Sequence, residues 1–150
     1  MIVVIQRVLN ASVHIKNKKT ASIDQGLLVL IGIAEEDTED TINWMVQKII
    51  HLRIFSDQGG KMNLSVKDIE GSILIVSQFT LHANTKKGNR PSFIEAAKPE
   101  KAIALYDKFI STIKQEGDIE IQTGIFGADM QVSLVNDGPV TLIIDSKNKK

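Results

Sequence analysis

The stretch "GLLVLIGIAEEDTEDTINWMVQKII" (26–50) decides the fold class, because its hydrophobic period changes part-way along. Residues 26–34 are uncharged, aliphatic and few in number, which predicts a strand buried on both faces. After them, apolar residues recur every three or four positions, as on the buried face of a helix. Asp37 or Thr38 can cap that helix, and the acidic residues that follow suit its N-terminal dipole. The stretch therefore predicts a strand followed directly by an amphipathic helix.

The rest of the chain adds a second strong strand and a second helix. The strand is predicted in "GSILIVSQFTLHA" (71–83), and the helix over 99–117, with Pro99 in its first turn and Gly117 as its C-terminal cap. Residues 56–63 are predicted to form a turn-rich connection. Further strands are predicted at 11–16, 119–126, 130–137 and 138–145.

The order of these elements predicts the architecture. Strands come in blocks and do not alternate strictly with helices, which favours a mainly antiparallel or mixed sheet. We expect one α+β domain over residues 1–145, with roughly seven strands curled into a barrel-like core and two main helices. Residues 146–150 are predicted to be a flexible tail.

The composition excludes several classes of function. The 150 residues are 43% hydrophobic, and eighteen basic residues balance eighteen acidic ones. Net charge therefore gives no sign of nucleic-acid binding, although a local basic patch would be enough to hold phosphates. The absence of cysteine removes disulfides, thiolate nucleophiles and cysteine metal sites. The N-terminus resembles a strand rather than a signal peptide, and the longest apolar run, 27–34, is too short to span a membrane. We expect a cytoplasmic protein.

Most catalytic and cofactor signatures are missing from the sequence. It contains no Walker A loop, no dinucleotide fingerprint and no G-x-S-x-G elbow. The histidines His14, His51 and His82 have no metal-ligand spacing, so we expect neither a cofactor nor a metal. If residues 77–83 continue as a strand, Thr80 and His82 share one face. A conventional esterase that uses this pair is then conceivable, but no orienting acid is evident.

Two short motifs carry the remaining functional signal. In "SQFTL" (77–81), polar side chains end a strand that is otherwise predicted to be fully buried. They either pair with neighbours or line a pocket, because an unpaired buried polar group is costly. In "NDGPVT" (136–141), residues that favour a β-turn stand together between two apolar strands. The Gly-Pro bond in this second motif could be cis.

Together with "KGNRPSF" (87–93) and "FGADMQVSLVNDGPVT" (126–141), these motifs closely resemble the D-aminoacyl-tRNA deacylase family. The resemblance covers essentially the whole chain. It implies an enzyme that hydrolyses the ester between a D-amino acid and the 3′-terminal ribose of tRNA, and that also removes glycine from mischarged tRNA. It further implies a small barrel-like domain that works as a homodimer, with active sites at the dimer interface.

The resemblance also assigns roles to residues. It implies that Gly138 and Pro139 form a cis peptide that reaches into the partner subunit's pocket, where rigid backbone rejects an L side chain and lets a D side chain or glycine pass. It places a set of four residues around the terminal adenosine and the ester, with backbone N–H groups for the oxyanion and the ribose 2′-hydroxyl assisting. That set is Ser77, Gln78, Phe79 and Thr80. Phe126 and Met130 are implied to lie near the pocket.

The loop that follows the first motif carries Lys86, Lys87 and Arg90. These charges fit contacts with tRNA phosphates or an ordinary solvated loop equally well. The missing catalytic set keeps one alternative function open. It is a non-catalytic dimer that binds RNA 3′ ends or nucleotides.

Overall fold

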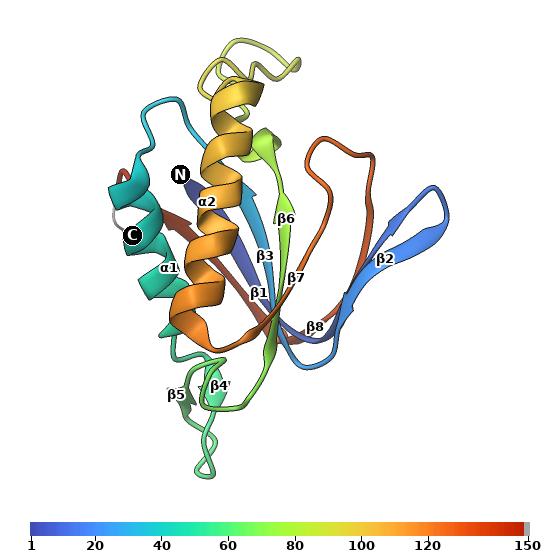
Figure 1. Ribbon diagram of the computed structural model, residues 1–150, viewed down its shortest axis with the longest axis vertical. Coiled ribbons are helices and arrows are strands. Elements are labelled where there is room, and N and C mark those ends of the chain that lie inside the picture. Colours follow the sequence, from blue (N-terminus) through green and yellow to red (C-terminus); the bar gives the residue numbers. More distant parts are fainter. Residues whose placement is uncertain (149–150) are drawn as a thin grey trace.

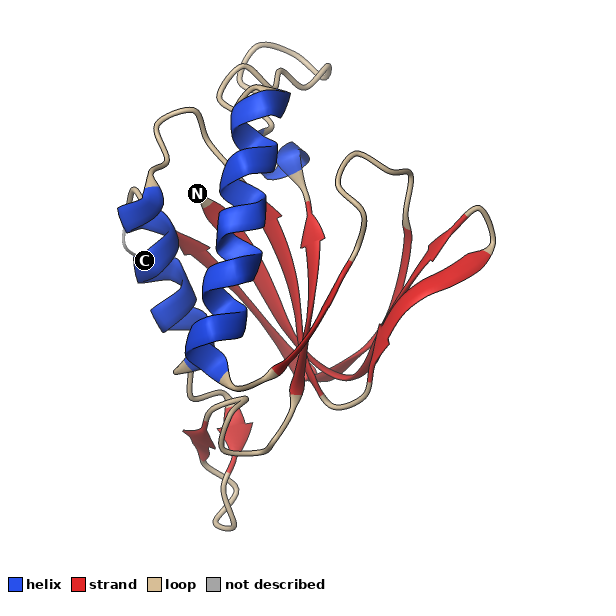
Figure 2. Ribbon diagram, in the orientation of Figure 1, coloured by secondary structure: helices blue, strands red, loops and turns tan. Residues whose placement is uncertain are grey.

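Two helices cover one face of a strongly twisted sheet in the computed structural model, which describes residues 1–148 (Figure 1). Helix α1 (Glu39–Ile50) and helix α2 (Pro99–Gly117) lie side by side against this face. Beyond them the sheet curls until it nearly closes into a barrel (Figure 2). The predicted α+β class, with two main helices and a barrel-like core, is confirmed.

The main sheet is mixed, as predicted. Its order is β2-β1-β3-β6-β7, and β8 also pairs with β1. Strand β1 runs antiparallel to β2, β3 and β8, whereas β3, β6 and β7 run parallel to one another. The strands are β1 (Ile2–Ile15), β2 (Lys18–Ile23), β3 (Gly26–Gly32), β6 (Ser72–Ser77), β7 (Glu120–Thr123) and β8 (Gln131–Asp145).

A small separate hairpin occupies the segment that we predicted to be a turn-rich connection. It consists of β4 (Phe55–Ser56) and β5 (Met62–Leu64). The turn between them is organised by the Asp57 carboxylate, which accepts the N–H groups of Gly59 at 2.8 Å and Lys61 at 3.0 Å. The same carboxylate accepts the Asn63 amide at 2.7 Å, and these hydrogen bonds hold the pKa of Asp57 below its usual value. The Asp57 side chain thus adds hydrogen bonds to the turn between the two short paired strands.

The two strands that we predicted at 130–137 and 138–145 form one long strand, β8, with a corner in its middle. Gln6 of β1 pairs with Thr141, and Val8 pairs with Asn136. Residues 137–140 therefore stand opposite Arg7 alone and leave the ladder as a bulge. The corner lies beside the amino end of β3, because Val8 also pairs with Gly26.

Apolar side chains fill both sides of the two central strands. The main cluster lies between the sheet and the helices and contains Val29, Ile75 and Phe109. A smaller cluster on the other face contains Leu28 and Leu74. Successive strand residues face opposite sides, so alternate residues of β3 and β6 enter the two clusters. Burial on both faces explains the uncharged runs in the sequence and confirms that prediction.

Of the two candidate caps for α1, Thr38 is the N-cap. Its N–H donates to the Thr41 hydroxyl at 3.3 Å. Asp37 instead accepts the Met1 ammonium at 2.6 Å and the Ala34 N–H at 2.7 Å, and its side chain is buried. The carboxylate therefore serves a buried ion pair and not the helix.

Helix α2 starts at Pro99 as predicted, but its C-terminus differs in detail. Gly117 is the last helical residue, and the left-handed residue that ends the helix is Asp118, with a φ of 47°. Aspartate tolerates this conformation better than most residues, since its short side chain can hydrogen-bond locally.

The end of the described chain is joined to its beginning. The Ser146 N–H donates to the Met1 carbonyl at 2.9 Å, and the Asn148 amide donates to the Asp145 carboxylate at 2.6 Å. Residues 149 and 150 of the predicted tail lie outside the described residues. Within residues 1–148, no helix is long and apolar enough to cross a membrane.

Candidate active site

A pocket of about 830 Å³ lies at the carboxyl ends of β3 and β6. The start of α2 forms one of its walls, and residues 126–132 form another. Its lining is mostly apolar, with Ser77 and Gln78 at the end of β6 as polar exceptions. Lys98 is the one titratable side chain that residues 1–148 contribute to the lining. The pocket therefore suits a largely apolar group that also carries polar atoms.

The SQFTL motif does not continue as a strand, which corrects our expectation. Strand β6 ends at Ser77, and Phe79–His82 form a 3₁₀ helix, η1. The turn is tied to the neighbouring strand by the Gln78 N–H, which donates to the Ile31 carbonyl at 2.7 Å. It also lies directly on Gly32, where a Cβ atom would come within 2.9 Å of the Gln78 carbonyl oxygen. Only glycine at residue 32 allows this close approach.

The proposed Thr80–His82 pair does not form, because the two residues no longer alternate along a strand. Thr80 is exposed, and its hydroxyl accepts the side-chain amide of Gln78. His82 is buried, and its Nε2 finds no hydrogen-bond partner within residues 1–148. The geometry thus gives Thr80 no histidine base.

Three of the four residues predicted around the ester line the pocket, namely Ser77, Gln78 and Phe79. Thr80 lies beside them on η1 without lining it. Phe126 and Met130, predicted near the pocket, both line it. Met130 occupies space that only a glycine leaves free, because a Cβ atom on Gly124 would lie 2.6 Å from the Met130 sulfur.

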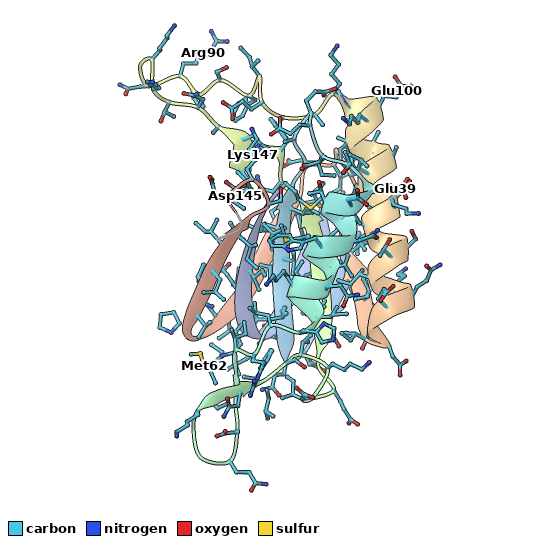
Figure 3. All side chains as sticks on the ribbon, turned by 90° about the vertical axis from the view of Figure 1, so that its left-hand side faces the viewer. Glu39, Met62, Arg90, Glu100, Asp145 and Lys147 are labelled. Carbon is cyan, nitrogen blue, oxygen red and sulfur yellow. The ribbon has the colours of Figure 1, made fainter. Side chains whose placement is uncertain are left out.

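The basic loop, defined as residues 84–92, is attached to the pocket at its base. Asn84 and Ser92 exchange two backbone hydrogen bonds of 2.8 and 2.9 Å, which close the loop. Next to this neck, Phe93 packs edge-on against Phe79, with ring centroids 5.1 Å apart. The three cations of the loop are exposed. Arg90 lies beyond one end of the sheet, and Met62 on β5 lies at the other end of the molecule (Figure 3). Positive charge is therefore presented beside the pocket.

The Gly138–Pro139 bond is cis, as predicted. Both residues are exposed, and neither lines the pocket of their own chain. They sit at the β8 corner near the amino end of β3, whereas the pocket lies at the carboxyl end of that strand. The two sequence motifs therefore lie at opposite ends of β3 within one chain.

Arg7 holds this corner and was missed in the sequence. Its buried guanidinium donates to the Ile54 carbonyl at 2.6 Å and to the Asp137 carbonyl at 3.2 Å, and forms an ion pair with the Asp137 carboxylate at 3.1 Å. A Cβ atom on Gly138 would lie 3.0 Å from Arg7 Nη2, and the φ of Gly138, +126°, also favours glycine. The signal was available, since Arg7 is a lone charge within an apolar strand.

The Asn136 side chain closes the base of the corner. Its amide donates to the Arg7 carbonyl and to the Val140 carbonyl, both at 3.0 Å. These two bonds replace ladder pairing where residues 137–140 leave the sheet. The side chains of Asn136 and Arg7 therefore both hold the corner that contains the Gly-Pro bond.

The sequence profile of the D-Tyr-tRNA(Tyr) deacylase family matches residues 4–145. The chain belongs to this family. Relatives named D-aminoacyl-tRNA deacylase from Flavobacterium psychrophilum and Cytophaga hutchinsonii are 63% and 62% identical to it over 150 residues, which is 100% of each chain. The predicted family and enzyme class, a hydrolase, are confirmed.

Solved structures support the fold of this D-Tyr-tRNA(Tyr) deacylase family member. One, titled "c-Myc DNA Unwinding Element Binding Protein", is 42% identical and has a TM-score of 0.91, with 97% of this chain and 98% of that chain covered. Another, titled "Structural Analysis of a probable eukaryotic D-amino acid tRNA deacylase", is 21% identical and has a TM-score of 0.80, covering 95% and 97%. The second likeness concerns the fold alone.

The pocket of this family member offers positioning groups but no acid–base set. No carboxylate or imidazole from the described chain lines it. Nor do residues 1–148 bring three metal-ligating side chains together anywhere. The N–H groups of Phe79 and Thr80 lie in the first turn of η1, where such groups have no intrahelical acceptor. Such an arrangement can orient a reactive ester and donate hydrogen bonds to it.

Proposed function

We propose that this chain hydrolyses the ester of D-aminoacyl-tRNA at the pocket between β3, β6 and α2. The observation that carries the proposal is the composition of the pocket wall. Ser77, Gln78 and Phe79 line a mostly apolar pocket of about 830 Å³, to which residues 1–148 contribute no acid–base pair. An aminoacyl ester is already reactive, so an enzyme that positions it need not supply a full triad.

In this proposal the terminal adenosine lies in the apolar part of the pocket, beside Phe126 and Met130. The ester carbonyl points to η1, where backbone N–H groups of Phe79 and Thr80 stabilise the oxyanion of the tetrahedral intermediate. The ribose 2′-hydroxyl assists the attack of water on the carbonyl carbon. The bond to the ribose oxygen then breaks, and the proton from water restores the ribose hydroxyl. The products are a free amino acid and uncharged tRNA.

Chiral selection is proposed to come from Gly138 and Pro139 of a second copy. Their exposure, and their distance along the sheet from their own pocket, support an arrangement in which each chain completes the other's site. The rigid backbone of the pair occupies the space of an L side chain. A D side chain points outward and glycine has none, so both D-aminoacyl and glycyl esters are proposed substrates.

The homodimer in this proposal needs an interaction surface, and β8 is a candidate. The strand pairs only with β1 within the described residues, which leaves its outer edge free to meet another chain. Val135 and Ile143 on this strand are 47% and 67% exposed, unusually high for branched aliphatic residues. Burying them against a second copy would bring the β8 corner into the interface.

The basic loop is proposed to contact tRNA phosphates. Lys86, Lys87 and Arg90 form no ion pair within residues 1–148, so their charges are available to a ligand. The neck of the loop reaches the pocket through the contact between Phe79 and Phe93. A tRNA acceptor end placed in the pocket would then bring its phosphates near this loop.

We also propose a cytoplasmic location, because tRNA, the proposed substrate, is charged there.

The test is paired deacylation of D-Tyr-tRNA and L-Tyr-tRNA by the purified protein, with and without EDTA. The proposal expects rapid loss of the D ester, slow loss of the L ester, and no effect of EDTA. Equal loss of both esters would show that Gly138 and Pro139 do not select between D- and L-aminoacyl esters.

One alternative is favoured by the absence of an acid–base set. It is a dimer that binds RNA 3′ ends or nucleotides without chemistry. Loss of neither ester in the deacylation experiment, from a folded protein, would put this alternative first. Binding of uncharged tRNA in the same preparation would then support it.

A further inference from the structure

Tyr106 stands directly behind the pocket without touching its interior. It lies on α2, is 5% exposed, and is absent from the pocket lining. Its ring packs against Phe126 in a tilted arrangement, with ring centroids 5.6 Å apart. Phe126 does line the pocket, so Tyr106 can influence the pocket through this one contact.

The Tyr106 hydroxyl is attached to the same wall by a second route. It donates a hydrogen bond to the Ile75 carbonyl at 3.3 Å. That carbonyl also accepts the Gly124 N–H at 2.9 Å, so the two donors meet on one oxygen. Burial raises the pKa of Tyr106 to about 12, and the hydroxyl is protonated and able to donate at neutral pH with or without this shift.

Gly124 is the first residue of the irregular part of the wall. Strand β7 ends at Thr123, and strand β8 begins only at Gln131. Between them the chain has one local backbone bond, from the Ala128 N–H to the Ile125 carbonyl at 3.2 Å. The segment 124–130 supplies Phe126 and Met130 to the pocket with little regular structure of its own. Contacts from outside the segment must therefore fix its position.

We propose that Tyr106 is a positioning residue, which holds the pocket wall 124–130 in place through Phe126 and the Ile75 carbonyl and thereby sets affinity for the 3′-terminal adenosine. The inference rests on the proposed function for the identity of this ligand. It predicts an effect on binding and KM, whereas a purely structural role would change stability alone.

The experiment compares Tyr106→Leu, Phe126→Leu and the double variant, with adenosine 5′-monophosphate binding and the KM and kcat of D-Tyr-tRNA deacylation as readouts. Loss of one aromatic pair should weaken binding and raise KM roughly three- to tenfold, with kcat changed less than about twofold. If Tyr106 acts through Phe126, the double variant should be no worse than the worse single variant. Tyr106→Phe keeps the ring and removes only the hydroxyl, and should show a smaller rise in KM.

Phe109→Leu is the matched control, because Phe109 lies on the same helix, is fully buried and does not line the pocket. It should lower stability without raising KM. A similar rise in KM in Phe109→Leu, or fully additive effects in the double variant, would overturn the role of Tyr106. If the wild type binds the nucleotide but hydrolyses neither ester, the proposed function fails, and nucleotide binding by the same variants still decides the role of Tyr106. If the wild-type enzyme is active but does not bind the nucleotide, the inference about Tyr106 fails while the proposed function stands.

Discussion

Replacement of Arg7 by methionine tests how the β8 corner is held. Methionine keeps the apolar stem and removes the guanidinium, which leaves the Ile54 and Asp137 carbonyls and the Asp137 carboxylate without their donor. The Arg7 side chain is only 10% exposed, whereas that of Asp137 is 34% exposed. Removing one partner of a buried ion pair costs about 3–5 kcal/mol. Because water can solvate the remaining carboxylate, we expect the lower end, about 3 kcal/mol.

The free energy of unfolding should be measured by urea denaturation of the variant and the wild type at the same protein concentration. Asp137→Asn is the control, since it removes only the charge and keeps the backbone carbonyl that Arg7 also binds. It should cost about 1 kcal/mol, as expected of a partly exposed pair. The two changes together should cost less than their sum, because they break the same interaction. An Arg7→Met protein within about 0.5 kcal/mol of wild type would refute this account of the corner.

Three further predictions concern the pocket and the basic loop. Gly32→Ala should lower kcat/KM by about tenfold or more, because the added Cβ meets the backbone carbonyl of Gln78 next to η1. Gly124→Ala should mainly raise KM, because its Cβ meets the flexible end of the Met130 side chain. Equal effects of the two variants in deacylation assays would contradict this contrast. Thr80→Val should keep most of the turnover on D-Tyr-tRNA, and its loss would restore a nucleophilic role for Thr80. Replacing the three cations of the basic loop by alanine should reduce the slope of log affinity for tRNA against log salt by roughly two to three. An unchanged slope would show that the three cations are solvated and do not contact tRNA phosphates.

Local pattern was enough to predict several elements of this fold. The uncharged runs of β3 and β6, and the helical spacing in α1 and α2, each lie within one short segment. A period of two or of 3.6 residues is a property of neighbours along the chain, so sequence alone reveals it. The corner at Gly138 and Pro139 was predicted for the same reason, since its turn residues are adjacent.

The site was only partly predictable. The sequence placed polar residues at the end of a buried strand, which left paired neighbours or a pocket as alternatives, and the family resemblance favoured the pocket. It did not indicate that the strand stops at Ser77, because the turn that follows is fitted to the neighbouring strand through the Gln78 bond to Ile31 and the close approach to Gly32. Those partners lie more than forty residues earlier in the chain, and no local period records them. The Thr80–His82 pair, which a continued strand would have made conceivable, is absent for that reason.

The sequence by itself determined the main strands and the two helices, and which two motifs are unusual. Only the tertiary structure decided what those motifs contact. It brought Arg7 to a corner 130 residues further along, and set Tyr106 of α2 behind Phe126. It also placed the two motifs at opposite ends of β3. The pocket lies at the carboxyl end of this strand, and the Gly138–Pro139 corner lies near its amino end. Contacts of this kind depend on how strands pair and layers pack, and neighbouring residues along the chain carry no direct record of either.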